Sequence, residues 1–333
     1  MLKEIIIDGK IINDKSDAYI VAEIGLNHNH DMELTKKMIL SAKRNGADAV
    51  KFQTYITEKL INHNEPAFQI FKRLELNMEE FREISDYCRE VGITFFSTPF
   101  SLESVDLLEE IGVPCFKIAS MDINYFELMQ YAAKSGKPMI LSTGFGNLGE
   151  IEKAIAMINR LGNDNIIILH CVSKYPPKYS EMNLKMIEKY RTIFEYPVGF
   201  SDHSPDNTMA VVSRVMGAVM IEKHFTLDKN LDGPDHSISL EPDDLLDLKK
   251  KLQAVDDGLL TQFKEQKDQV ISQKSRRSLY SASDFKKGTV VTKDMIVAIR
   301  PGIGIAPEFL PIFIGRVLKK DIKRGELVDL SFI

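Results

Sequence analysis

Two histidines stand at the ends of consecutive apolar runs, each among other polar residues. His203 lies in GFSDHS (199–204), and His224 lies in EKHFT (222–226). If the two runs are neighbouring parallel strands, they lie about 5 Å apart, and both imidazoles can bind one divalent ion. Asp122 or a water molecule would complete its coordination. With oxygen atoms as the remaining ligands, Mn²⁺ fits better than a structural zinc, which needs four N/S ligands.

A second pair of histidines, His28 and His30, is the alternative metal site. The two alternate in the segment NHNHD (27–31), whose composition is that of a loop. We expect His28 to line the site and His30 to be exposed to solvent. A further alternative for His203 or His224 is an ordinary core histidine bonded to a backbone carbonyl.

Two lysines lie inside apolar runs, Lys51 in DAVKFQ and Lys117 in CFKIA, where a cation needs an anionic partner. Together with hydroxyl groups at other run ends they would form a cradle for a phosphate and a carboxylate. These hydroxyls belong to Thr98, Ser120, Ser142, Ser173 and Tyr175. The alternative is an internal ion pair of each lysine with Glu23 or Glu222. The sequence has no Walker A or GxGxxG motif, so we do not expect a nucleotide site.

The elements that must position these residues alternate along the chain. Short apolar runs are each followed by an amphipathic stretch, and several of these stretches end in glycine, as helices do. This alternation predicts a parallel sheet, and eight repeats in about 255 residues favour a (β/α)8 barrel over a doubly wound open sheet. The runs are 19–24, 48–53, 93–97, 115–119, 138–142, 166–171, 197–201 and 218–223.

Polar residues follow all eight predicted strands, at the barrel end where active sites lie. Any one of them alone could be a surface hydrogen-bonding group. A whole ring that faced nothing would bury lysines and histidines at a high cost, so we interpret the ring as one site. Its members are Glu23, Asn27, Lys51, Gln53, Ser97, Thr98, Lys117, Ser120, Asp122, Ser142, Thr143, His170, Ser173, Ser201, Asp202, His203, Glu222, Lys223 and His224.

Composition divides the chain into three parts. Residues 1–265 are the predicted barrel, which begins with a small hairpin. Residues 266–280 are polar and charged, and they are predicted to be a linker. Residues 281–333 contain short alternating strands and two similar turns, DFKKG and DIKRG, which predict a small β-rich domain. A domain of roughly 50 residues has little core of its own, so we expect it to dock on another surface.

Charge and composition exclude several classes of function. The net charge of −5 is scattered along the chain, so no basic surface for nucleic acid is expected. No run of 18 or more apolar residues is present, so no membrane span is expected. The first residues lack the apolar region of a signal peptide. The three cysteines are widely spaced, which is typical of reduced, buried thiols in a cytoplasmic protein.

A series of segments in the same order resembles the sialic acid synthases, the family that condenses phosphoenolpyruvate with a sugar to make nonulosonic acids. The resemblance covers nearly the whole chain and implies a TIM barrel followed by an antifreeze-like (SAF) domain. The segments are AEIGLNHNHD (22–31), AVKFQTY (49–55), FSTPF (96–100), FKIAS (116–120), ILSTG (140–144), LHCVSKYP (169–176), GFSDHS (199–204), EKHFT (222–226), GPDHSISLEP (233–242) and RPGIGI (300–305).

The resemblance also implies roles for individual residues. His203 and His224 would bind Mn²⁺, or Mg²⁺ or Co²⁺ in its place, with Asp122 at the acidic position nearby. Arg300 would reach the sugar in the barrel of a partner subunit, through a domain-swapped homodimer. Glu23, Lys51, Gln53 and Asp235 would line the reacting centre and the sugar. The residues implied to bind phosphoenolpyruvate are Thr98, Lys117, Ser120, Ser142, Ser173, Tyr175 and Ser201.

The implied reaction joins phosphoenolpyruvate to an open-chain N-acyl hexosamine, either N-acetylmannosamine or a related 2,4-diacetamido sugar. His30 stands where the family usually has glycine, and Asp122 stands where glutamate is commoner. The segment SDHSPDN also departs from the usual pattern, so the identity of the sugar stays open. The alternatives are a synthase for another aldose, of the Kdo type, a lysine Schiff-base aldolase that splits nonulosonates, and a non-catalytic sugar-binding protein.

Overall fold

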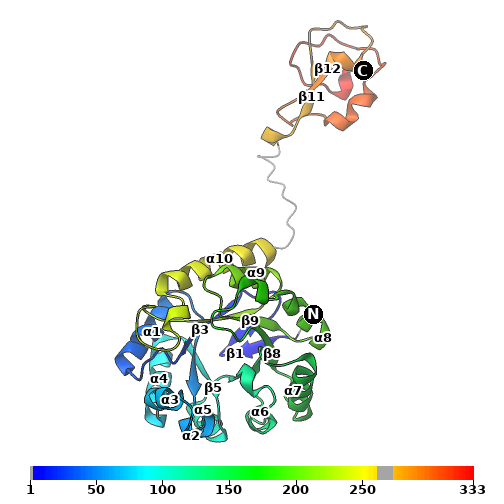
Figure 1. Ribbon diagram of the computed structural model, residues 1–333. Coiled ribbons are helices and arrows are strands. Elements are labelled where there is room, and N and C mark those ends of the chain that lie inside the picture. The colour runs from blue at the N-terminus through cyan, green and yellow to red at the C-terminus, as the bar shows by residue number, and fades with distance from the viewer. Residues whose placement is uncertain (1–2, 261–272) are drawn as a thin grey trace. The chain divides into compact units, whose positions relative to one another are not determined.

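The computed structural model describes residues 3–260 and 273–333, which belong to two compact units (Figure 1). The described residues up to Leu260 belong to the first unit, and those from Gln273 onward belong to the second. The predicted barrel boundary at 265, and positions 266–272 of the predicted linker, lie outside the described residues. Within the described part of that linker, strand β11 already begins at Ser278.

Eight parallel strands of the first unit form a closed barrel in the order β10-β3-β4-β5-β6-β7-β8-β9. This confirms the predicted (β/α)8 barrel, and each strand begins and ends within two residues of its predicted run. The strands are β3 (Tyr19–Gly25), β4 (Ala49–Thr54), β5 (Thr94–Pro99), β6 (Phe116–Ile118), β7 (Met139–Ser142), β8 (Ile166–Cys171), β9 (Val198–Asp202) and β10 (Met220–His224).

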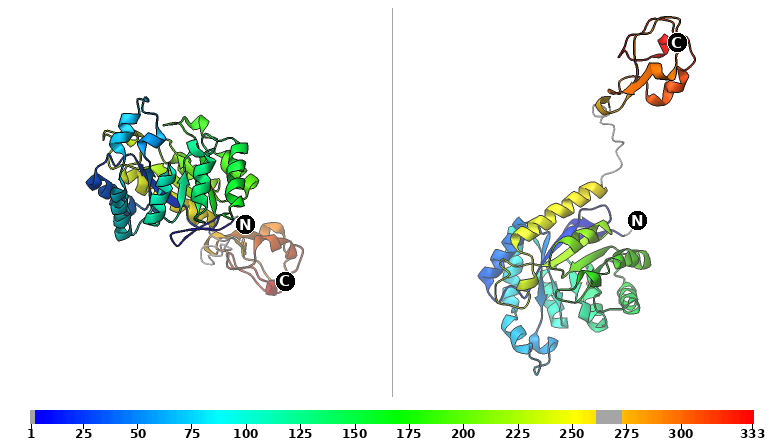
Figure 2. Two further views of the ribbon diagram at one scale, coloured as in Figure 1. Left: turned by 90° about the horizontal axis from the view of Figure 1, so that it is seen from below. Right: turned by 45° about the horizontal axis from the view of Figure 1, so that its top comes forward.

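Helices surround the barrel, as Figure 2 shows from two further directions. Several begin at side-chain caps: Asn77 and Asn147 each form a capping box with a glutamate three residues later. None of the described helices is long and apolar enough to cross a bilayer. The helices are α1 (Met32–Arg44), α2 (Thr57–Leu60), α3 (Phe68–Leu74), α4 (Met78–Val91), α5 (Leu102–Ile111), α6 (Phe126–Ala133), α7 (Leu148–Arg160), α8 (Lys185–Phe194), α9 (Thr208–Val215) and α10 (Pro242–Leu260), with 3-10 turns η1 (Ser120–Asp122), η2 (Tyr179–Glu181) and η3 (His236–Ile238).

The inside of the barrel changes from apolar to polar along each strand. Alternate residues point inward, and the inward positions near the strand starts carry apolar side chains such as Val21, Ala49 and Ile140. The N-terminal hairpin, β1 (Ile5–Ile7) and β2 (Lys10–Ile12), packs its buried isoleucines against this cluster. The hairpin therefore covers the N-terminal end of the barrel, and the same inward positions become polar at the other end.

The second unit is a small domain with its own core. Strand β11 (Ser278–Ser281) pairs antiparallel with β12 (Ile296–Ile299), and further isolated bridges link the remaining segments. Three 3-10 turns complete it: η4 (Lys293–Met295), η5 (Pro307–Ile312) and η6 (Leu330–Phe332). Its core consists of Leu279, Val291, Met295, Phe313, Leu318, Ile322, Val328 and Phe332.

Candidate active site

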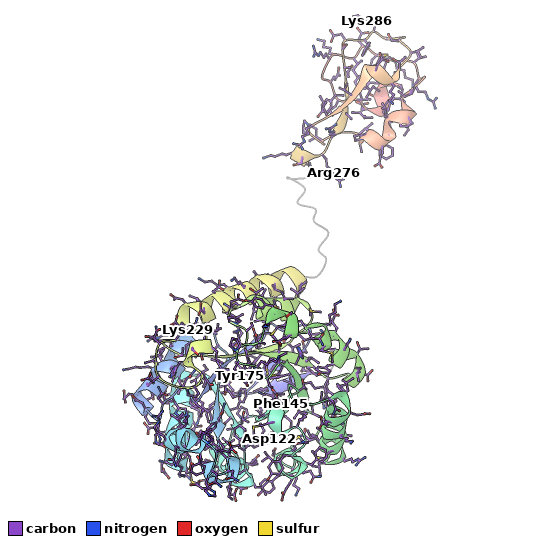
Figure 3. All side chains as sticks on the ribbon, in the orientation of Figure 1. Asp122, Phe145, Tyr175, Lys229, Arg276 and Lys286 are labelled. Atoms are coloured by element: carbon purple, nitrogen blue, oxygen red, sulfur yellow. The ribbon has the colours of Figure 1, made fainter. Side chains whose placement is uncertain are left out.

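A cavity of about 280 Å³ lies at the C-terminal ends of the barrel strands. Its floor consists of inward-facing strand residues, and its upper wall comes from the loops and short helices that follow the strands. Tyr175 and Phe145, labelled in Figure 3, belong to this upper wall. The predicted site residues that line the cavity are Glu23, Lys51, Gln53, Thr98, Lys117, Ser120, Ser142, Ser173, Tyr175, Ser201, His203 and His224.

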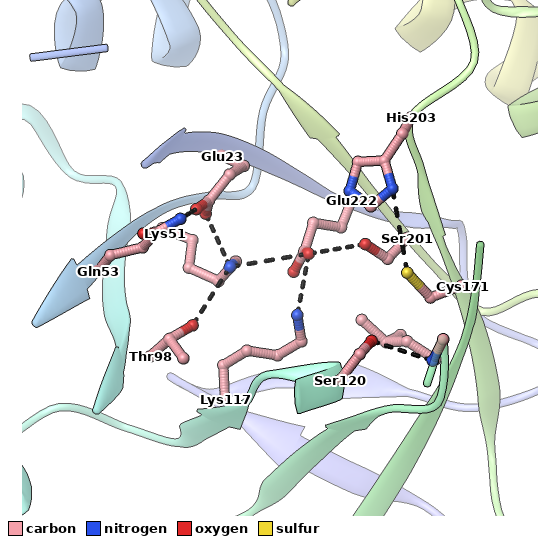
Figure 4. A network of polar contacts seen from close by, with 12 residues as sticks. Glu23, Lys51, Gln53, Thr98, Lys117, Ser120, Cys171, Ser201, His203 and Glu222 are labelled. Carbon is pink, nitrogen blue, oxygen red and sulfur yellow. Dashed lines mark hydrogen bonds and ion pairs between the residues drawn. The ribbon is translucent and has the colours of Figure 1, made fainter. Parts of the chain in front are cut away.

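Two lysines and two glutamates form a buried network on the floor (Figure 4). Lys51 Nζ lies 2.8 Å from Glu23 Oε2 and 3.7 Å from Glu222 Oε1. Lys117 Nζ lies 2.9 Å from Glu222 Oε1, and Ser201 Oγ donates to the same oxygen at 3.0 Å. The alternative expectation, that each lysine forms an internal ion pair with Glu23 or Glu222, is therefore correct. The same ammonium groups also line the cavity.

The two glutamates of this network have opposite tendencies to bind a proton. Burial raises the pKa of Glu23, and repulsion from Glu222 adds to the effect although Lys51 opposes it. Burial also acts to raise the pKa of Glu222, but the ammonium groups of Lys117 and Lys51 outweigh it and lower that pKa to about 2. Glu222 therefore stays ionised, whereas Glu23 is the carboxylate on the floor that takes up a proton more readily.

Hydroxyl groups stand around these charges. Thr98 Oγ1 accepts a hydrogen bond from Lys51 Nζ at 3.3 Å, and Ser120 Oγ accepts one from the backbone N–H of Gly144 at 3.0 Å. Ser142 Oγ is buried and has no hydrogen-bond partner in the described part of the chain. A Cβ atom at Gly144 would lie 2.2 Å from Ser173 Oγ, so any larger residue there would displace this hydroxyl. The floor thus offers cations and hydroxyl donors to one anion.

The two imidazoles predicted to bind a metal lie side by side. The ring centroids of His203 and His224 are 5.5 Å apart, and the ring of Tyr175 lies 4.2 Å from that of His203. His203 Nδ1 is 3.1 Å from the carbonyl oxygen of Val172, which leaves its Nε2 for another partner. Burial lowers the pKa of His224, which favours the neutral ring that binds metals.

No group of three or more His, Cys, Asp or Glu that could hold a metal occurs among residues 3–260 and 273–333. The two imidazoles are suited to an ion that takes its remaining ligands from water or substrate. His224 Nδ1 supports this reading because it is buried without a hydrogen bond, and its neighbour Asp235 Oδ2 is 3.8 Å away.

Three predicted site residues do not line the cavity. Asp122 lies in η1, where its Oδ2 is buried without a hydrogen bond to a described residue, and burial raises its pKa to about 6. Asp235 lies next to His224, as described above. Arg300 belongs to the second unit, where it is exposed and has no ion pair with an acid in the described ranges. The backbone beside it is fixed by Tyr280 Oη, which donates to the carbonyl oxygen of Pro301 at 3.0 Å.

The alternative histidine pair is also outside the cavity. His28 is buried against the ring of Phe52 at 6.3 Å, and burial lowers its pKa to about 3. His30 is exposed, as expected, and its Nε2 lies 2.9 Å from Glu80 Oε1. The expectation that His28 lines the site is therefore wrong, because its ring packs against the side chain of a strand residue.

Several members of the predicted strand-end ring point away from the cavity. Lys223 Nζ is bound by Asp202 Oδ2 at 2.8 Å and by the carbonyl oxygens of Ser204 and Asp206, both at 2.9 Å. His170 stacks on Phe200 outside the cavity. Neighbouring residues of a strand face opposite sides, so Glu222 and His224 point inward while Lys223 points outward. The interpretation of every strand-end residue as part of one ring was too broad.

The sequence analysis missed part of the cavity lining. Cys171 lies on the floor, with its Sγ 4.0 Å from His203 Nδ1. Burial acts to raise the pKa of this thiol, but His203 and Lys117 outweigh it and hold the pKa below its ordinary value. All three cysteines are buried and free, as predicted. The other missed residues are apolar, and they are Leu60, Ile61, Phe71, Phe100, Ala119, Met121 and Phe145. Inward alternation on β8 was the available signal for Cys171.

Comparison with known proteins agrees with this arrangement. A model described as the NeuB family matches residues 38–263, and a SAF domain model matches residues 276–333. The chain is 40% identical to an uncharacterized protein of Methanocaldococcus jannaschii over 98% of each chain. It is 38% identical to the N,N'-diacetyllegionaminic acid synthase of Campylobacter jejuni, over 93% of this chain and 98% of that one.

A solved structure is similar over most of the chain. The crystal structure of N-acetylneuraminic acid (sialic acid) synthetase from Leptospira borgpetersenii covers 81% of this chain and 94% of its own, with a TM-score of 0.77 and 35% identity. The motifs that run from the first strand to the small domain therefore reflect common descent. The chain belongs to the NeuB family and carries a C-terminal SAF domain.

Proposed function

We propose that the protein condenses phosphoenolpyruvate with the open-chain form of an N-acyl hexosamine and releases phosphate. The observation that carries this proposal is the cavity floor, where two ammonium groups and several hydroxyls stand beside two imidazoles and two carboxylates. Phosphoenolpyruvate has a phosphate and a carboxylate, which such a floor binds. The C. jejuni relative, whose name describes a synthase of a diacetylated acid, supports an N-acylated sugar as the second substrate.

The charge of the floor indicates that phosphoenolpyruvate needs additional positive charge. Lys51 and Lys117 are already balanced by Glu23 and Glu222. An incoming anion is bound more tightly when a divalent cation is held nearby. His203 and His224 would hold Mn²⁺, or Mg²⁺ or Co²⁺, and this ion would act as a Lewis acid on the aldehyde oxygen of the sugar.

Each residue then has a task in the reaction. Lys117, Lys51 and the hydroxyls of Thr98 and Ser142 hold phosphoenolpyruvate, with Ser120, Ser173, Tyr175 and Ser201 around them. Carbon 3 of phosphoenolpyruvate forms a bond with the aldehyde carbon, and a cation develops at carbon 2. The ionised Glu222 stabilises this positive charge. Water adds to carbon 2 as Glu23 accepts one of its protons, with Gln53 bonded to Glu23 Oε1 at 3.3 Å. Phosphate then leaves with the proton of the new hydroxyl, whose oxygen becomes the keto oxygen, and the alkoxide on the former aldehyde carbon takes the proton from Glu23.

We also propose that the SAF domain completes the site of a partner subunit in a domain-swapped homodimer. Arg300 is the exposed cation of a loop whose backbone is held by β11, where Gly304 N–H donates to Ser278 Oγ at 2.8 Å. An exposed guanidinium on a fixed loop suits binding to the acyl group of a sugar. Asp235 would contact the same sugar from the barrel side.

A phosphate-release assay tests the proposed reaction. The full-length protein with Mn²⁺ and phosphoenolpyruvate is mixed with a panel of N-acyl hexosamines, including a 2,4-diacetamido sugar. We expect release that depends on both substrates. Release with arabinose 5-phosphate, but not with any of the N-acyl sugars, would indicate a Kdo-type synthase. Trapping of pyruvate on a lysine by borohydride would indicate a Schiff-base aldolase, and sugar binding without release would indicate a binding protein.

A further inference from the structure

A buried ammonium group lies on the outer side of the strands, behind the two imidazoles. Lys223 stands directly before His224 in β10 and points away from the cavity, since neighbouring residues of a strand face opposite sides. It is 3% exposed. Its Nζ lies 2.8 Å from Asp202 Oδ2 and donates to the carbonyl oxygens of Ser204 and Asp206, both at 2.9 Å. Each N–H group of the ammonium therefore has an acceptor, and the reaction proposed above gives this cation no task.

The three acceptors of Lys223 stand on both sides of His203 in the chain. Asp202 precedes His203, whereas Ser204 and Asp206 follow it. Asp202 Oδ1 also accepts from the backbone N–H of Ser204 at 2.8 Å, and Ser204 Oγ donates to the carbonyl oxygen of Asp206 at 3.3 Å. This turn from Asp202 to Asp206, which we call the histidine turn, is therefore folded around one buried cation.

The same ion pair joins the ends of the two strands that carry the imidazoles. Asp202 and Lys223 are register partners of the parallel strands β9 and β10. His203 directly follows Asp202, and His224 directly follows Lys223, so each imidazole is one residue away from a member of the pair. The ring centroids of the two histidines are 5.5 Å apart. The ion pair thus holds together the backbone from which both rings project.

The ring of His203 has little else to hold it. Its Nδ1 is 3.1 Å from the carbonyl oxygen of Val172, and its closest aromatic neighbour, Tyr175, is 56% exposed. Two imidazoles bind one ion tightly only when groups around them fix the orientation of both rings. For His203, most of this orientation has to come from the backbone of the histidine turn.

We propose that Lys223 is a positioning residue for metal binding: its ammonium group fixes the histidine turn so that His203 and His224 face the same ion. A buried ion pair is a poor means of stabilising a protein, because apolar residues of similar volume are often as stable or more so. Fixing one conformation of the turn gives this pair a role that apolar residues lack. The inference rests on the metal-assisted condensation proposed above, and it adds a residue outside the cavity to the metal site.

The test is a titration of the full-length protein with Mn²⁺, followed by electron paramagnetic resonance. Lys223→Met keeps the apolar stem of the side chain and removes its charge and donors. The Kd for Mn²⁺ should rise by at least about 10-fold, as is typical when a group that orients a metal ligand is lost. The KM for phosphoenolpyruvate at saturating Mn²⁺ should change by less than about 2-fold, because Lys51 and Lys117 lie on the other face of the strands and do not contact Lys223.

The matched control is a second buried cation of the barrel. Arg214 binds Asp256 and donates to the carbonyl oxygens of Ala218 at 2.9 Å and Ser16 at 2.7 Å. These two carbonyls precede β10 and β3, at the opposite end of the strands from the imidazoles. Arg214→Met, like Lys223→Met, leaves a buried carboxylate without its cation and should lower the denaturant concentration at which the protein unfolds. Its Kd for Mn²⁺ should stay unchanged.

Asp202→Asn is a second, milder variant of the same contact. It keeps the shape of the side chain and an oxygen for the N–H of Ser204, but it removes the charge that faces Lys223. The Kd for Mn²⁺ should rise here as well, by a smaller factor than in Lys223→Met. A Kd does not depend on the fraction of folded protein, so partial unfolding of either variant does not imitate this result.

The outcomes separate this inference from the proposed function. An unchanged Kd for Mn²⁺ in both variants of the contact, or an equal rise in Arg214→Met, would overturn the role of Lys223 and leave the metal assignment intact. A rise in the KM for phosphoenolpyruvate as large as that in the Kd would also overturn it, because Lys223 would then support the whole of β10. If the original protein itself binds no Mn²⁺, the metal assignment in the proposed function fails, and this inference fails with it.

Discussion

Charges that are fully matched inside the free protein limit how the floor of the cavity can receive its substrate. Lys117 and Lys51 neutralise Glu222 and Glu23 at distances of 2.8 to 3.7 Å. Such a network is costly to bury but more costly to break, because removal of one partner leaves an uncompensated charge. The lysines therefore keep Glu222 ionised although it is buried, and they become anion-binding groups when phosphoenolpyruvate enters.

Replacement of Lys117 tests its role in binding phosphoenolpyruvate. Lys117→Met should raise the KM for phosphoenolpyruvate far more than that for the sugar, because a desolvated charge contact contributes about 2–4 kcal/mol. The exposed Lys134→Met is the control, with both KM values unchanged. The measurement is the KM for each substrate, determined at a saturating concentration of the other substrate. Equal increases for both substrates would mean that Lys117 is structural.

Metal dependence tests the paired imidazoles. Excess chelator should abolish phosphate release, and Mn²⁺ should restore it, because the described residues offer no further lysine or arginine on the floor to assist the aldehyde oxygen. His203→Ala and His224→Ala should each reduce the rate by several orders of magnitude and weaken Mn²⁺ binding measured by electron paramagnetic resonance. The exposed His63→Ala should change neither. Full activity in excess EDTA would contradict the assignment.

The raised pKa of Asp122 predicts a pH-dependent stability. Burial raises this pKa from an ordinary value near 4 to about 6, so the folded state binds more protons than the unfolded state between these values. Stability is therefore lost as the pH rises from about 4 to 6. Above pH 6, Asp122→Asn should be more stable than the original protein by about 2 kcal/mol, since partial exposure of the carboxylate lowers the full cost of its charge. Below pH 4 the two proteins should be equally stable.

Denaturant unfolding of the barrel at several pH values measures this difference. The control is Asp17→Asn, at an exposed position, which should change stability by less than about 0.5 kcal/mol at any pH. A difference for Asp122→Asn that is constant from pH 4 to 8 would show that burial of the charge is not its cause.

Which residues reach the floor could be predicted largely from the sequence, because strand ends and residue types are local features. Glu23, Lys51 and His224 were found in this way. The pairing of the lysines could only be stated as an alternative, since it depends on distances across the barrel. His28 could not be placed, because its contact with Phe52 involves two different elements.

At the scale of elements, the strand starts and ends were predictable, but the direction of each side chain was the weaker point. Asp202 is the last residue of β9 and Lys223 lies in β10, next to His203 and His224, yet Asp202 and Lys223 bind each other outside the cavity. Alternate residues of β10 face opposite sides, so counting from the inward-facing Glu222 would have excluded Lys223 from the predicted site. The α2–α3 segment was not predicted, because its short helices give no clear period. Its cavity-lining residues Leu60, Ile61 and Phe71 were missed with it.

The N-terminal hairpin gives a prediction at this scale. Ile7 is fully buried in the cluster that closes the barrel, whereas Ile6, on the opposite face of β1, is 55% exposed. Ile7→Ala should reduce the free energy of unfolding by about 2–5 kcal/mol. Ile6→Ala, the matched control, should change it by less than about 0.5 kcal/mol. Chemical denaturation of both variants is the measurement, and equal small effects would show that the hairpin does not stabilise the barrel.

At the scale of the whole molecule, charge separates the two units. Lysine and arginine outnumber aspartate and glutamate in residues 276–333, although the chain as a whole has a net charge of −5. The barrel is therefore the acidic part and the SAF domain the basic part. Opposite charges favour association of the SAF domain with a barrel. In the sequence analysis we treated the charge as scattered along the chain and missed this division, which in any case cannot tell whether the barrel belongs to the same subunit or to a partner.

Mixing of two inactive variants distinguishes these possibilities. Arg300→Ala keeps an intact barrel, and His224→Ala keeps an intact SAF domain. In a domain-swapped heterodimer one site receives both intact parts, so random exchange should restore about a quarter of the original phosphate release. A mixture of Arg300→Ala with the double variant His224→Ala/Arg300→Ala lacks any intact Arg300 and should recover nothing. If the first mixture, after subunit exchange, stays at the level of its separate components, Arg300 does not act across a swapped dimer.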